Sequence, residues 1–281
     1  MIGERGWGSR ILRIYLPVMG FLVLMLFPFY WMLIASIKPN RELYNAKIMP
    51  MIVYQPTLKH YYDLFADTNF LLWTYNTMLV AVITTAVSLV LGAMVAYPLA
   101  RMNFPGAAIV AIGVAATYLV PQPLLFIPMA DIINKLELGN TLSAVMLTYP
   151  TLLIPFCAWL LMGYFKSVPR ELEEAARIDG ASRFQAMWRV VLPLTTPGLL
   201  SAGIFAFTLA QNEFLYALIF LAKSEVRTVP VGAITELIRG DVFYWGQLMA
   251  AALLGSVPVA LIYSFFVEYY VEGLTAGSVK S

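Results

Sequence analysis

The stretch "SVPRELEEAARIDGASRFQAMWRVVLPLTTPG" runs from Ser167 to Gly198 in the middle of the chain. Nine charged residues lie between Lys166 and Arg189, both included, whereas the sequence on either side is almost free of charge. We expect a first helix with Ser167 as a capping residue, Pro169 in the first turn and glutamates near the start. Gly180 suits the left-handed position that closes such a helix.

The second half of this stretch predicts a second short helix. Ser182 and Gln185 have the spacing of a capping box, in which each side chain bonds the other residue's backbone. Pro193 is expected to stop the helix. The apolar residues of the two helices are Leu172, Ala175, Ala176, Phe184, Met187, Trp188 and Val191. The pattern therefore indicates a helix, a glycine turn and a helix.

The composition indicates a membrane protein. The chain has 281 residues, of which 60% are hydrophobic and 12% charged, with a mean hydropathy of +0.77. Soluble domains are about 25% charged. A single cysteine, Cys157, and a single histidine, His60, exclude an internal disulfide, a cysteine-built metal site and a histidine-based triad. We expect no catalytic residues and no metal site.

Six apolar stretches are long enough to cross a bilayer, whose core of roughly 30 Å needs about 20 helical residues. They are about 11–37, 72–97, 107–130, 141–165, 195–222 and 246–271. The third contains Pro121, Pro123 and Pro128, which predict a kink or a break. That feature serves either packing or a broken helix that lines a polar pathway. The expected fold is one all-α membrane domain over residues 1–281.

An even number of spans places both termini and the charged loop 166–194 on one side of the membrane. Of the 18 Lys and Arg residues, that side carries ten: three near the N-terminus, Arg101, five in the loop and Lys280. The other side carries eight, so the positive-inside rule favours a cytoplasmic loop by a small margin. The balance of five basic and four acidic residues in the loop argues against nucleic-acid binding. A solvated loop and a docking element for a cytoplasmic partner both stay open.

The stretch "EAARIDGASRFQAMWRVVLP" from Glu174 resembles the EAA motif of importer-type ATP-binding cassette permeases. The positions that match are Glu174, Ala175, Ala176, Asp179, Gly180, Ala181, Leu192 and Pro193. The C-terminal "VEGLTAGSVKS" is similar to the tail of carbohydrate-importer permeases of the maltose type, and "NEFLYAL" and "RTVPVG" are also similar to that family. Gln211 departs from it, because relatives commonly carry tryptophan there.

This resemblance implies one of two permease subunits of a type I, ATP-driven, binding-protein-dependent sugar importer in the bacterial inner membrane. The EAA loop would be the coupling helix that docks on an ATPase subunit, with both termini cytoplasmic and tail 272–281 near the ATPase interface through Gly273, Gly277 and Lys280. The implied partners are a second homologous permease, a dimer of ATP-binding subunits, an extracytoplasmic sugar-binding protein and membrane lipid, with no nucleic acid.

The chain contains no G-x-x-x-x-G-K-[ST] phosphate loop, and "GLTAGSVKS" lacks the Gly-Lys pair. We therefore expect no cofactor here, with ATP and Mg bound by the partner ATPase, and no enzymatic activity. A membrane enzyme acting on a lipid-linked sugar would need a D-x-D motif or a second histidine, and the sequence has neither. The alternative cargo is an amino acid, a polyamine or phosphate, against which the tail argues.

Polar residues inside predicted spans are candidates for the translocation pathway, because lipid cannot satisfy them. They are Asn76, Gln122, Gln211, Asn212 and Glu213. Hydrogen bonds that join helices are the structural alternative. Glu213 is the one carboxylate well inside a predicted span, where an ionised group costs about 2.5–3.5 kcal/mol. We expect it to be hydrogen-bonded and to face a partner helix or a water-filled route.

The predicted loop 223–245 carries candidates for contact with a binding protein or a sugar. These are Arg239, Asp241 and Tyr244. Trp245 follows directly, at the start of the last span, where an aromatic residue is typical of the membrane interface. Residues 38–70 mix polar and aromatic side chains and are expected to form an ordered exterior loop.

Overall fold

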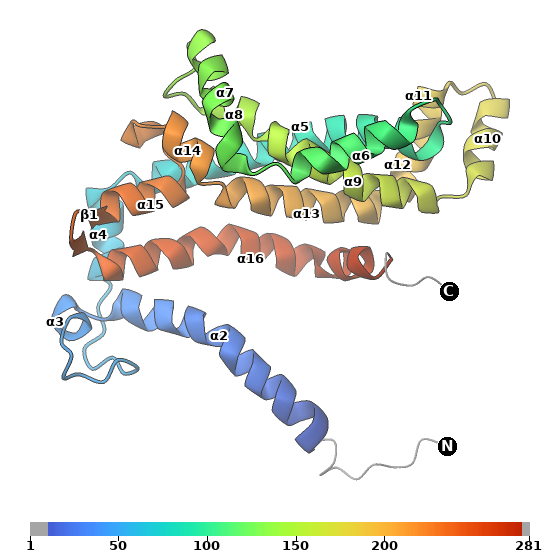
Figure 1. The fold of residues 1–281 in the computed structure, drawn as a ribbon. Coiled ribbons are helices and arrows are strands. Elements are labelled where there is room, and N and C mark those ends of the chain that lie inside the picture. Colours follow the sequence, from blue (N-terminus) through green and yellow to red (C-terminus); the bar gives the residue numbers. More distant parts are fainter. Residues whose placement is uncertain (1–10, 277–281) are drawn as a thin grey trace. The chain divides into compact units, whose positions relative to one another are not determined.

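The computed structural model describes residues 11–276, with side chains up to residue 266. Within these residues the regular secondary structure is helical except for one short hairpin, which confirms the all-α fold class (Figure 1). By length and composition, four helices of the described part can cross a membrane, or up to six if each of two bent helix pairs counts as one span. The chain divides into two compact units, described separately below.

One unit comprises the chain up to Phe70 together with Ala233–Ser256. Its complete elements are η1 (Ile11–Tyr15), α2 (Leu16–Ile37), α3 (Asn40–Leu43), α4 (Lys59–Asp67), β1 (Ile238–Arg239) and β2 (Val242–Phe243). The hydroxyl groups of Ser36 and Tyr61 lie 2.8 Å apart and join α2 to α4. His60 Nε2 lies 2.9 Å from the Lys38 carbonyl oxygen and is buried. The expected exterior loop 38–70 is therefore ordered by α3, α4 and these bonds.

The other unit comprises Leu71–Gly232 together with the chain from Val257. Its helices are α6 (Ala107–Tyr118), α7 (Gln122–Lys135), α8 (Leu142–Thr148), α9 (Pro150–Ser167), α10 (Arg170–Ile178), α11 (Arg183–Ala186), η2 (Met187–Val191), α12 (Leu192–Leu194), α13 (Thr196–Asn212), α14 (Leu215–Phe220) and η3 (Ser224–Val226). Three further helices have residues in both units: α5 (Phe70–Arg101), α15 (Val229–Leu237) and α16 (Trp245–Ala276).

Helix α9 is central to this second unit, because it packs against both α6 and α13 (Figure 1). Its buried residues belong to two apolar clusters. One cluster includes Leu153 and Cys157, and the other includes Leu161 and Phe165. Gly92 of α5 allows α5 and α9 to approach closely, since an added Cβ at Gly92 would lie 2.8 Å from the Cys157 Cβ. Packing of small residues is a common way for membrane helices to associate.

Two of the helix pairs in this unit are sharply bent. Helices α6 and α7 meet at 94°, and the segment from Arg183 to Leu194 meets α13 at 81°. The proline-rich stretch of the predicted third span is thus a break, with Pro121 as the residue that precedes α7. Proline has no backbone donor to lose at a helix start, so it begins a new helix there instead of kinking an old one. The predicted span 107–130 is correspondingly two helices, the second of which ends at Lys135.

The charged loop differs from the sequence prediction at its first helix start. Ser167 is the last residue of α9, and its hydroxyl donates to the Tyr164 carbonyl, so it does not cap α10. Pro169 is the N-cap position instead of a first-turn residue. Pro193 lies inside the last turn of its helical segment, which ends one residue later at Leu194. The glycine turn and the capping box are confirmed, with Gly180 at φ +91° and Ser182 Oγ accepting from the Gln185 N–H.

Candidate functional site

A cavity of about 580 Å³ lies where the break between α6 and α7 comes together with the break between α13 and α14, and its largely apolar wall carries a cluster of polar side chains. The polar side chains that line it include Thr117, Tyr118, Gln122, Thr208, Asn212 and Glu213. The first three come from the end of α6 and the start of α7, and the last three from the end of α13 and the residue beyond it. The breaks therefore direct polar groups from distant parts of the sequence into one space.

Glu213 is the best-satisfied of these side chains. It follows α13, and its carboxylate accepts hydrogen bonds from the backbone N–H groups of Tyr216 (2.8 Å) and Ala217 (3.1 Å) in the first turn of α14. The Gln122 side-chain amide donates a third bond of 2.7 Å. Only 9% of Glu213 is exposed, and the three donors compensate its carboxylate for the lost contact with water. The sequence predicted a hydrogen-bonded Glu213 inside a span, and the structure places it at the break between two helices.

The other pathway candidates divide into two groups. Asn212 lines the cavity, and its side-chain amide donates to the Thr208 carbonyl at 2.8 Å. Asn76 is buried away from the cavity lining and donates to the backbone carbonyls of Glu225 and Arg227 at 2.9 and 3.0 Å. Gln211 is also buried and outside the described lining. The structure therefore brings together Gln122, Asn212 and Glu213, and gives Asn76 a helix-to-loop role.

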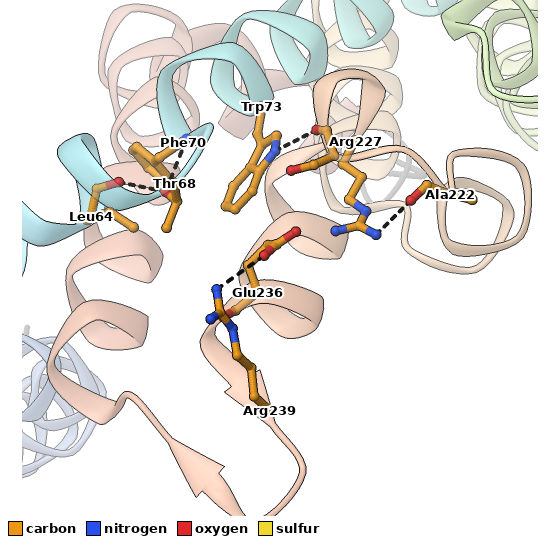
Figure 2. A network of polar contacts seen from close by, with 9 residues as sticks. Leu64, Thr68, Phe70, Trp73, Ala222, Arg227, Glu236 and Arg239 are labelled. Carbon is orange, nitrogen blue, oxygen red and sulfur yellow. Dashed lines mark hydrogen bonds and ion pairs between the residues drawn. The ribbon is translucent and has the colours of Figure 1, made fainter.

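The anchoring of residues 224–229 on α5 was not predicted from the sequence. The Trp73 indole N–H donates to the Ser224 carbonyl at 2.8 Å, and Thr77 Oγ1 accepts from the Val229 N–H at 2.8 Å. Figure 2 shows the Trp73 ring beside this segment and the Arg227 guanidinium turned toward the Ala222 carbonyl, to which it donates at 2.6 Å. Trp73, Asn76 and Thr77 share one helix face, and that three- and four-residue spacing is the signal that could have revealed the anchor.

The charged loop presents an exposed surface. Helix α10 has no buried residue, and Glu174, Ala175, Asp179 and Gly180 are exposed, while Ala176 and Ala181 are half-buried. Large apolar side chains are exposed beside them: Leu172, Ile178, Phe184 and Trp188. Ile178 is 86% exposed, and the Phe184 and Trp188 rings pack edge to face at 6.0 Å. Such an apolar patch on a charged helix pair is typical of a protein-binding surface.

The candidates for contact with a binding protein lie in one hairpin of the first unit. Strands β1 and β2 pair through Arg239 and Val242, and the turn holds Gly240 at φ +58° and the exposed Asp241. The Arg239 guanidinium bonds the Glu236 carbonyl and carboxylate, as Figure 2 shows for the latter, and lies 6.0 Å from the Tyr244 ring centre. The sequence did not predict this hairpin, because two-residue strands carry no alternating pattern.

The tail residues proposed from the sequence lie at or beyond the end of the part of the chain that the structure describes. Gly273 lies in α16, beyond the last residue whose side chain is described. Gly277 and Lys280 lie outside the described residues. Among residues 11–266, no group of three or more His, Cys, Asp or Glu side chains has the arrangement of a metal site.

Comparison with known proteins defines the class of protein. Residues 88–275 match the family described as "Binding-protein-dependent transport system inner membrane component". Because this match covers more than half of the 281 residues, the chain belongs to this family. It is an inner-membrane permease component of a transport system.

Individual relatives agree with this class. The chain is 39% identical to the sulfoquinovosyl glycerol transport system permease protein SmoH of Agrobacterium fabrum, over 91% of this chain and 89% of that protein. It is 33% identical to the trehalose/maltose transport system permease protein MalG of Thermococcus litoralis, over 92% of each. The fold is similar to a chain from the crystal structure of a bacterial ABC transporter involved in import of the acidic polysaccharide alginate. That TM-score is 0.77 at 21% identity, covering 95% of this chain and 99% of the other.

Proposed function

We propose that this chain is a permease subunit of an ATP-driven, binding-protein-dependent sugar importer and forms half of its translocation pathway. The cavity at the α6–α7 and α13–α14 breaks, with its cluster of polar side chains, is the observation that supports this most directly. In a membrane, irregular backbone is tolerated where it is buried or lines a water-filled space, and broken helices commonly form transport sites. SmoH and MalG are named as permeases for sulfoquinovosyl glycerol and for trehalose and maltose, and such cargo suits a cavity that carries amides and hydroxyls on an otherwise apolar wall.

The chemistry of the cavity suits a neutral, hydroxyl-rich solute. Gln122 and Asn212 offer amide groups, Thr117 and Thr208 offer hydroxyls, and Tyr118 adds an aromatic ring. A volume of about 580 Å³ lies within the range of roughly 300–1,000 Å³ that is typical of small-molecule sites. The Glu213 charge is held by three donors within the chain, so it positions Gln122 and does not require a cationic cargo.

The energy source in this proposal is a partner ATPase, which binds ATP and Mg. Helix α10, with Glu174 and the glycine turn at Gly180, docks on that subunit from the cytoplasmic side, where both termini also lie. The exposed apolar side chains of the loop give the docking its contact area. The tail through Gly273, Gly277 and Lys280 reaches the interface of two such ATPase subunits. A second homologous permease completes the pathway, and the hairpin with Arg239, Asp241 and Tyr244 contacts the extracytoplasmic sugar-binding protein.

The test is uptake by the complete transporter in proteoliposomes. The chain is purified with its second permease, ATPase and binding protein, and offered sulfoquinovosyl glycerol, trehalose and maltose beside glutamine, spermidine and phosphate. We expect ATP-dependent accumulation of at least one of the sugars and of none of the other three compounds. Accumulation of glutamine, spermidine or phosphate instead would contradict the sugar assignment and leave the permease class standing.

A further inference from the structure

Two neighbouring glutamates of α10 have different surroundings. The Glu174 side chain is exposed, whereas the Glu173 side chain is only 14% exposed and turns toward the end of α5. There, the Tyr97 hydroxyl donates to Glu173 Oε1 at 2.5 Å, and Arg101 Nε lies 3.5 Å from Glu173 Oε2. The Tyr97 oxygen also lies 3.2 Å from the Arg183 carbonyl, at the start of α11. Two residues of α5 thus reach both helices of the charged loop.

Apolar packing does not hold α10 in place within this chain. The helix has no buried residue, and its apolar side chains Leu172 and Ile178 are exposed. Its main packing partners are α11 and η2, which belong to the same loop. Apart from its chain link to α9, α10 is therefore connected to a membrane helix through the polar cluster of Tyr97, Arg101 and Glu173.

The Arg101 guanidinium makes this connection dependent on Glu173. Its side chain is 2% exposed, and among the described residues Glu173 is the carboxylate within ion-pair distance. Arg101 Nε and Nη2 have no hydrogen-bond partner in the described part of the chain. Arg101 also lines a polar cavity of about 250 Å³, whose other charged residues are Arg170, Arg177, Arg183, Glu173 and Glu174, so three further cations and one further carboxylate lie around it. Loss of one member of a buried pair leaves an uncompensated charge, which is strongly unfavourable.

We propose that Tyr97, Arg101 and Glu173 form a latch that fixes α10 to α5, so that displacement of α10 by a partner ATPase moves the membrane helix. The inference rests on the proposed function, because it requires that α10 contacts the ATPase. It assigns different roles to the adjacent glutamates: Glu173 is a positioning residue within the chain, and Glu174 contacts the partner. Tyr97 and Arg101 are positioning residues on the membrane side.

The test measures coupling in the complete reconstituted transporter, as the ratio of ATPase rates with and without sugar-loaded binding protein. We expect Glu173→Gln to lower this ratio at least about fivefold, since the neutral amide no longer balances the buried Arg101 charge. Tyr97→Phe removes one hydroxyl without a change of shape and is expected to lower the ratio about twofold to threefold. Glu137→Gln is the matched control for coupling, because Glu137 is exposed and lies outside the charged loop, and it should match the wild type. Glu171 is exposed on α10 itself and serves as the control for hydrogen exchange of that helix.

Charge exchange separates positioning from a general loss of structure. The single variants Arg101→Glu and Glu173→Arg place like charges together, whereas the double variant restores an opposite pair at the same place. We expect the double variant to recover a ratio above that of either single variant. Hydrogen exchange at the α10 amides of the same complexes should quicken about tenfold in Glu173→Gln and remain at the wild-type rate in Glu171→Gln.

Two results separate failure of the latch from failure of the proposed function. Wild-type ratios in Tyr97→Phe and Glu173→Gln would overturn the latch, and so would a double variant no better than the worse single variant. If Gly180→Val and Glu174→Ala also keep wild-type ratios, then α10 does not couple to an ATPase and the proposed function fails as well. If those two variants uncouple and the latch variants do not, only the latch is wrong.

Discussion

The side-chain amide of Gln122 donates a 2.7 Å hydrogen bond to the Glu213 carboxylate, although the two residues are 91 positions apart in the chain. Gln122 is the first residue of α7, and Glu213 lies between α13 and α14, so the bond joins the α6–α7 and α13–α14 breaks that border the cavity. The same carboxylate accepts two backbone N–H groups of α14. A single side chain therefore fixes three helix ends around the proposed sugar path.

Glu213→Ala should destabilise the subunit and abolish most uptake. It removes the acceptor of three hydrogen bonds, and each buried donor left unsatisfied costs about 1–3 kcal/mol. We expect an apparent loss of at least about 3 kcal/mol, which is measurable as a lower thermal unfolding midpoint in detergent. Glu213→Gln should be milder, because the amide oxygen can still accept from Gln122 and Tyr216 while the amide nitrogen faces the Ala217 N–H. Wild-type midpoints and uptake in both variants would show that these bonds are dispensable.

Asn76→Ala should mainly lower stability, whereas Asn212→Ala should mainly weaken sugar uptake. Asn76 holds the Glu225 and Arg227 carbonyls, so its loss should lower the unfolding midpoint and leave the KM for sugar unchanged. Asn212 lines the cavity and donates to the Thr208 carbonyl of its own helix, so its loss should raise KM with a smaller change in the midpoint. A raised KM in Asn76→Ala, or an unchanged one in Asn212→Ala, would contradict these roles.

Gly232→Ala should destabilise the anchor of residues 224–229 on α5. An added Cβ at Gly232 would lie 2.3 Å from Trp73 Cδ2, and Trp73 is fully buried, so the ring or α15 must move. Overpacking of this kind costs about 1–3 kcal/mol. Gly163→Ala is the control, because Gly163 is also helical and has nothing within 4 Å of an added Cβ. Alanine there should raise the unfolding midpoint slightly, so the two substitutions are expected to shift it in opposite directions.

Local features of the fold could be predicted from the sequence, and long-range contacts could not. The capping box at Ser182 and the left-handed Gly180 depend on residues within one turn, and both are confirmed. The prolines after α6 predicted either a kink or a broken helix, and the structure has the broken helix. The Gln122–Glu213 and Tyr97–Glu173 bonds join residues 91 and 76 positions apart, and nothing in the local pattern specifies such partners. The sequence therefore identified polar candidates without showing which of them meet.

The purified chain alone should neither bind nor hydrolyse ATP. The sequence has no phosphate loop with the Gly-Lys pair, and such a loop supplies the backbone donors and the lysine that hold the phosphates. The measurement is ATP binding by calorimetry and phosphate release in detergent, with the full complex as the positive control. Hydrolysis by this subunit free of its partners would contradict the assignment of ATP and Mg to another chain.

Gly180→Val should leave the subunit folded and disconnect it from its ATPase. Gly180 has φ +91° at the turn between α10 and α11, and an added Cβ would meet nothing within 4 Å in this chain. The expected intramolecular cost is thus mainly the left-handed backbone, about 1–2 kcal/mol, while the larger side chain alters the surface offered to the partner. Gly106→Val is the matched control, because Gly106 has φ +87°, is equally open and precedes α6. Both variants should lose similar thermal stability, and only Gly180→Val should severely reduce sugar-stimulated ATP hydrolysis and uptake.

Glu174→Ala should have an intermediate effect, because it removes one contact and leaves the turn intact. Equal stimulation in Gly180→Val and Gly106→Val would mean that α10 is a solvated loop.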